Sequence, residues 1–229
     1  MEKPRYWEVD ALRGLAIVLM VAYHFFFDIG FLEIASIDLQ DAPLLILQRT
    51  TAFLFLVLVG VSLALGKPDF KKTLNRAAKL GAIAILITIA TSIYPGKGAI
   101  VFGIIHFIAV SVLLGYFFLS FKWLTLLAAL GVLAAWILAG GFIQGSPYLI
   151  WLGFPPADFY TLDYYPLLPW FSLVLFGIFI GKTFFPLKNR IAMSHLIEPL
   201  CFLGRNSLAI YLLHQPVLIV ALSALKSFV

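Results

Sequence analysis

One long apolar run near the start of the chain, Trp7 to Phe31, constrains the fold more than any other feature. Asp10, Arg13, His24 and Asp28 interrupt it. On a helix that turns about 100° per residue, these four positions fall within an arc of about 60°. A membrane helix that gathers its ionisable groups on one stripe is expected to turn that stripe toward protein, because such groups are costly in lipid. The rest of the chain is therefore interpreted as a scaffold around this stripe.

The composition excludes an ordinary soluble domain. Of 229 residues, 62% are hydrophobic and 12% are charged, whereas about a quarter of the residues of a soluble protein are charged. We predict an all-α, polytopic bundle forming a single domain over residues 1–229, in the cell membrane with the lipid bilayer around it. The first apolar run is too long for a cleavable signal. A single cysteine, Cys201, excludes an internal disulfide and a cysteine-based zinc site, and we predict no metal.

About seven segments are long and apolar enough to cross a hydrocarbon layer about 30 Å thick. They are expected near residues 9–31, 44–65, 76–94, 101–120, 122–141, 164–184 and 204–226. If seven helices alternate in direction, 13 of the 16 lysines and arginines fall on one side. The positive-inside rule then predicts a cytoplasmic N-terminus and an external C-terminus. This placement explains the net charge of +5 without a nucleic-acid partner.

Two connections have a distinct character. The external connection at about 142–163 is rich in aromatic residues and prolines, which is typical of a segment lying in the membrane interface. The internal connection 185–203 is interpreted as a short amphipathic interfacial helix with Lys188 and Arg190 on its wet side.

Within the first run, His24 and Asp28 are spaced to meet on one helix face. A carboxylate that orients an imidazole is typical of a general base, so we predict His24 as catalytic with Asp28 orienting it. The alternative is a histidine that only bonds a neighbouring helix. Arg13 lies eleven residues before His24, which is about 16 Å along the axis.

Further polar groups are expected to line an outward-facing pocket that holds the substrate: Arg49, His106, Asp163, His214 and Gln215. Arg49 is placed to offset Asp28. His214 and Gln215 precede Pro216, so an alternative role for them is to satisfy carbonyls that the proline frees. On the inner side, Arg13, Arg76, Arg205 and Asn206 lie at comparable depth beside a helix start, an arrangement that favours phosphate. The alternative is that these basic residues lie on the inner side only because of the positive-inside rule and bind no phosphate.

Four stretches resemble the small prokaryotic proteins grouped with the catalytic domain of heparan-α-glucosaminide N-acetyltransferase. They are WEVDALRGLAIVLMVAYHFFFD from Trp7, FGIIHFIAV from Phe102, YYPLLPWFSLVLFGIFIG from Tyr164 and FLGRNSLAIYLLHQPVL from Phe202. Arg13 and His24 also have the spacing found in the broader membrane acyltransferase-3 proteins. The resemblance implies a transmembrane acetyltransferase or other acyltransferase, with His24 catalytic and Arg13 facing the coenzyme.

Such an enzyme takes an acyl group from cytoplasmic acyl-coenzyme A and gives it to an acceptor, often a sugar hydroxyl or amine, on the outer side. The glucosamine acceptor of the animal lysosomal enzyme is not carried over, because its luminal region has no counterpart here. Direct transfer and an acyl-histidine intermediate stay open, as does a homo-oligomeric state. Two other functions also stay open: a haem-binding electron-transfer protein with His24 and His106 as axial ligands, and a transporter or flippase.

Overall fold

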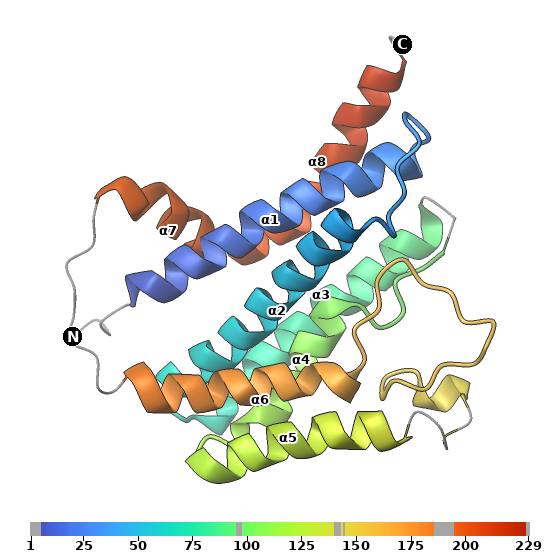
Figure 1. Cartoon of the computed structure of the whole chain (residues 1–229). Coiled ribbons are helices and arrows are strands. Elements are labelled where there is room, and N and C mark those ends of the chain that lie inside the picture. Colours follow the sequence, from blue (N-terminus) through green and yellow to red (C-terminus); the bar gives the residue numbers. More distant parts are fainter. Residues whose placement is uncertain (1–5, 95–97, 140–142, 144, 186–194, 228–229) are drawn as a thin grey trace. The chain divides into compact units, whose positions relative to one another are not determined.

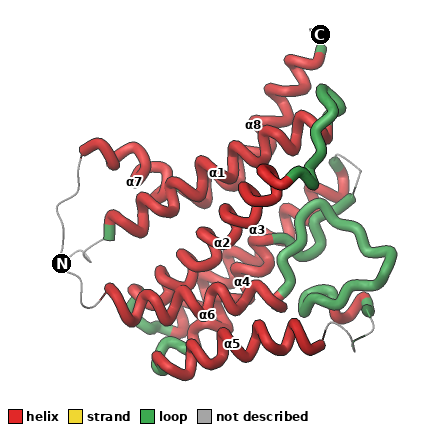
Figure 2. The backbone as a smooth tube through the Cα atoms, viewed as in Figure 1, coloured by secondary structure: helices red, strands yellow, loops and turns green. Residues whose placement is uncertain are grey.

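The described part of the chain is built from helices. The computed structural model describes residues 6–94, 98–139, 143, 145–185 and 195–227. Figure 2 shows these residues as helices joined by loops, and no strand forms among them. The α-helices are α1 (Trp7–Phe31), α2 (Ala42–Leu65), α3 (Phe70–Ile93), α4 (Ile104–Tyr116), α5 (Lys122–Ala139), α6 (Leu167–Phe184), α7 (Glu198–Arg205) and α8 (Ser207–Lys226). Two short 3-10 turns are η1 (Pro147–Leu149) and η3 (His195–Ile197).

The predicted all-α membrane class is confirmed, and the predicted number of spans is close. Six of the described helices are long and apolar enough to cross a membrane: α1, α2, α3, α5, α6 and α8. A helix occupies the predicted fourth span as well, but α4 has only 13 residues and rises about 20 Å. It begins late because Gly103 is extended and Phe102 pairs with Tyr164 in an isolated β-bridge.

Two helix boundaries differ from the predicted ones. Helix α3 begins at Phe70, six residues before the predicted span, because the side chain of Asp69 accepts a hydrogen bond from the backbone N–H of Lys72 at 3.0 Å. The last predicted span is divided at Asn206 into α7 and α8. The described part of the predicted interfacial connection is thus helical from Glu198, whereas Lys188 and Arg190 lie outside the described residues.

The described residues fall into two compact units, Met1–Leu58 with Asn189–Val229, and Val59–Lys188. In the first unit α1 lies beside both α7 and α8 (Figure 1). Helices α1 and α7 approach closely at two glycines: a Cβ on Gly14 would overlap the carbonyl group of Leu200, and one on Gly204 would overlap the carbonyl group of Asp10. Two glycines therefore let the backbones of α1 and α7 touch, as small residues do in membrane proteins.

The second unit is organised in the same way. Helix α3 packs on α4, and α5 packs on α6. A Cβ on Gly60 of α2 would overlap the carbonyl oxygen of Val174 on α6, so these helices also meet backbone to backbone. Outward-facing apolar side chains such as Ile93 and Leu138 are 78% and 68% exposed, as expected of surfaces that face lipid.

Candidate functional site

A pair of buried polar residues joins α1 to α8. Asp28 has no exposed surface, and its Oδ1 accepts a hydrogen bond of 2.7 Å from Nε2 of Gln215. The carboxyl group was expected to orient His24. Among the described residues no bond links Asp28 to His24, since Oδ2 of Asp28 and Nδ1 of His24 both lack a partner. The spacing of four residues places both groups on one helix face, but the carboxyl group accepts its hydrogen bond from the amide of Gln215.

His24 instead lies against His214. The two ring centroids are 4.8 Å apart and the rings are inclined by 60°. Nδ1 of His214 lies 2.6 Å from the backbone carbonyl oxygen of Tyr211. Pro216 deprives the carbonyl of Leu212 of its helical donor. The side chain of His214 bonds the neighbouring carbonyl of Tyr211, and that of Gln215 bonds Asp28.

Four buried polar atoms in this α1–α8 cluster have no hydrogen-bond partner among the described residues. They are Nδ1 of His24, Oδ2 of Asp28, Nε2 of His214 and Oε1 of Gln215. Buried polar groups are nearly always paired, and each unpaired one costs about 1–3 kcal/mol. Four in one cluster mark a place where water or a polar ligand can bind. Two are imidazole nitrogens, which can accept or donate protons near neutral pH.

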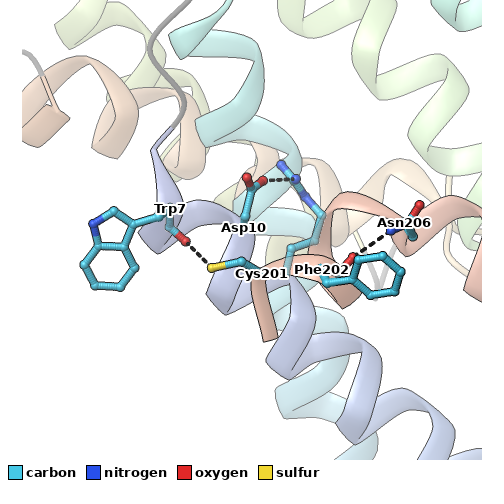
Figure 3. A network of polar contacts seen from close by, with 6 residues as sticks. Trp7, Asp10, Cys201, Phe202 and Asn206 are labelled. Carbon is cyan, nitrogen blue, oxygen red and sulfur yellow. Dashed lines mark hydrogen bonds and ion pairs between the residues drawn. The ribbon is translucent and has the colours of Figure 1, made fainter. Parts of the chain in front are cut away.

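A second polar group lies at the amino-terminal end of α1 (Figure 3). Arg13 donates to Oδ1 of Asp10 at 3.1 Å. The thiol of Cys201 on α7 lies 3.4 Å from the carbonyl oxygen of Trp7, and burial raises the pKa of this thiol. Asn206, expected beside a phosphate, precedes α8, and its side chain donates to the carbonyl of Phe202 at 2.9 Å (Figure 3).

Arg205, expected beside Arg13, is paired within α7. Its guanidinium donates to Glu198 at 2.5 Å, and this bond raises the pKa of Arg205. Both arginines thus carry a carboxylate partner, so a phosphate would have to compete with Asp10 and Glu198. Glu198 was missed because seven residues separate it from Arg205, a spacing that corresponds to two helical turns and gives no local motif.

The remaining predicted residues form other contacts. Arg49 is exposed on α2 and forms no ion pair with Asp28. Arg76, His106 and Asp163 belong to the second unit. Nε2 of His106 lies 3.1 Å from the hydroxyl of Thr88, which itself donates to the carbonyl of Ile100 at 2.6 Å.

Asp163 caps a helix. Its Oδ2 accepts from the backbone N–H of Ile104 at 2.9 Å, at the start of α4. A Cβ on Gly103 would overlap this oxygen, so any larger residue there would displace the carboxyl group. Desolvation raises the pKa of Asp163 to about 6, and the backbone bond from Ile104 opposes the shift. The carboxyl group thus has a structural role that its sequence position does not reveal.

Comparison with known protein families supplies the class of reaction. Residues 5–216 match the family model described as "Heparan-alpha-glucosaminide N-acetyltransferase, catalytic". The chain belongs to this family. The resemblance expected from the four sequence stretches is confirmed, and membership indicates a membrane acetyltransferase. The matched region includes Arg13, His24, Asp28, His214 and Gln215. Comparisons with curated proteins and with solved structures each gave no match.

Proposed function

We propose that the protein transfers an acyl group, in the simplest case acetyl, from acyl-coenzyme A to a hydroxyl or amine of a sugar or other small acceptor. The observation that carries this proposal is the α1–α8 cluster, where two imidazoles, a carboxyl and an amide lie together with four unpaired buried atoms. An acyl transfer needs a group to accept the acceptor proton and a donor to stabilise the carbonyl oxygen. Family membership supports the reaction class.

The coenzyme is proposed to bind at the amino-terminal end of α1. Its phosphates would be held by Arg13 and Arg205, with Asn206 beside them, once the guanidinium groups are shared with or released from Asp10 and Glu198. Bidentate arginine contacts suit phosphate oxygens. Arg13 and His24 are eleven residues apart on one continuous helix, so the pantetheine arm would span about 16 Å to reach the cluster.

The proposed direction of transfer is across the cell membrane. The excess of basic residues near one end of the spans supports a cytoplasmic coenzyme site. The acceptor would then enter from the outer side toward His24, His214 and Gln215. Arg49, His106 and Asp163 are not needed for this arrangement.

A radiochemical assay tests the proposal. Purified protein in detergent is incubated with labelled acetyl-coenzyme A and a panel of glycosides and amino sugars, and labelled product and free coenzyme A are measured. His24→Ala should lose at least 100-fold in transfer, the lower end of what either a positioned acid–base group or a hydrogen-bond donor to the carbonyl oxygen contributes. His195→Ala is the matched control, because His195 is an exposed histidine that is not one of the cluster residues. Absence of labelled product with the wild type, or equal transfer by His24→Ala, contradicts the proposal.

A further inference from the structure

The backbone of α8 fixes the tautomer of His214. Nδ1 of this ring lies 2.6 Å from the carbonyl oxygen of Tyr211. A carbonyl oxygen can only accept a hydrogen bond, so Nδ1 must carry the hydrogen. In the neutral imidazole the lone pair is then on Nε2. His214 thus carries its basic nitrogen at a defined position.

That basic nitrogen is buried and unused. The residue is 9% exposed, and no described residue hydrogen-bonds Nε2. The ring of His24 is its near neighbour, with centroids 4.8 Å apart. A buried nitrogen lone pair without a hydrogen-bond donor is destabilising, and the hydroxyl or amine of the acyl acceptor would supply that donor.

His24 lacks the corresponding support. No described residue bonds its Nδ1, and the carboxyl group that could have oriented it accepts from Gln215 at 2.7 Å. A general base is recognised by a second group that orients the imidazole through its other nitrogen. In this cluster the carbonyl of Tyr211 orients His214 in that way, whereas His24 has no described equivalent.

We propose that His214 is the general base of the acyl transfer and that His24 hydrogen-bonds the acyl carbonyl oxygen. This assignment rests on the proposed function. Nε2 of His214 takes the proton of the acceptor as the acceptor oxygen or nitrogen bonds to the thioester carbon. The carbon–sulfur bond then breaks, and the proton passes from Nε2 to the departing thiolate. The Nδ1 bond to Tyr211 persists throughout and stabilises the imidazolium.

Acceptors of different acidity distinguish a base from a structural residue. His214→Asn keeps a side-chain amide that can donate to Tyr211 and removes the basic nitrogen. It should reduce kcat for methyl glucoside, a hydroxyl acceptor, by about 10²–10⁴-fold. Hydroxylamine attacks without prior loss of a proton, so its acetylation should fall less than about tenfold. His24→Gln should reduce transfer to both acceptors alike, because the carbonyl oxygen is common to both.

Each outcome decides the assignment. The assignment is overturned if His214→Asn lowers the acetylation of methyl glucoside and of hydroxylamine by the same factor, or lowers neither. It is also overturned if the wild type acetylates hydroxylamine but not the glucoside. A wild type that acetylates neither contradicts the proposed function itself. If His214→Asn does not fold, ¹⁵N-histidine NMR of the wild type still decides. The signal that persists in variants of His24, His106 and His195 should report a protonated Nδ1, and a protonated Nε2 overturns the assignment.

Discussion

The contact between α1 and α7 allows a sharp prediction, because two glycines make it. Gly14 and Gly204 each approach a backbone carbonyl of the other helix so closely that an added Cβ would overlap it. Backbone cannot rotate aside as a flexible side chain can, so Gly14→Ala must push the helices apart. Overpacking of this kind costs about 1–3 kcal/mol.

The magnitude follows from two opposing effects. Alanine in place of glycine inside a helix gains about 0.5–1 kcal/mol. The net destabilisation is therefore about 0–2.5 kcal/mol, which lowers the melting temperature of a chain of this size by up to about 10 °C. Gly204→Ala should have a similar effect. The double variant should lose less than the sum, because both substitutions separate the same helices.

Thermal unfolding of detergent-purified protein measures this effect. The control is Gly81→Ala, since a Cβ at Gly81 meets nothing within 4 Å. This control should be neutral or raise the melting temperature. The KM for acetyl-coenzyme A should rise in Gly14→Ala, because Arg205 on α7 moves relative to Arg13. The packing argument is refuted if Gly14→Ala and Gly81→Ala unfold at the same temperature.

Three further predictions concern individual side chains. A double-mutant cycle of Asp28→Leu and Gln215→Leu, each of which removes one partner of the bond, should give a coupling energy of about 0.6–1.7 kcal/mol, as for a buried membrane hydrogen bond, and strict additivity would mean that the bond does not form. Because burial raises the pKa of Asp163 from 3.8 to about 6, its contribution to stability is complete below about pH 4 and is lost as the pH rises through about 6. Asp163→Asn cannot ionise, so its melting temperature relative to the wild type should increase over that range and then level, and a constant difference would refute the shift. Cys201 is buried, and burial raises the pKa of its thiol, so it should react with maleimide only after denaturation. A cysteine introduced by Leu196→Cys, at a position that is 92% exposed, should react at once. Rapid labelling of the native wild type would contradict the burial of Cys201.

Much of the fold follows from the sequence, because apolar segments of about 20 residues have few alternatives in a membrane. The helices α1, α2, α5 and α6 occupy the predicted segments within a few residues. The shortness of α4 and the early start of α3 were not predicted. They depend on a contact between Phe102 and Tyr164 and on a single capping side chain.

The sequence predicted which residues form the candidate site better than it predicted the hydrogen bonds between them. The stripe on α1 and the histidine of α8 could be selected because ionisable groups at membrane depth are rare. Which polar atom meets which could not be read from spacing, because Asp28 and Gln215 are 187 residues apart in sequence. The carbonyl of Tyr211 could not be foreseen either, since every helical residue offers one and side-chain rotamers decide its use.

The central claim is that acetyl passes along α1 from the Arg13 end to the His24–His214 pair, and vesicles test it most directly. The protein is reconstituted into sealed liposomes with labelled acetyl-coenzyme A inside and an acceptor glycoside outside. The account predicts labelled glycoside in the external medium while the coenzyme A stays inside, and no such product with His24→Ala. Labelled glycoside that forms only after the vesicles are lysed would contradict it.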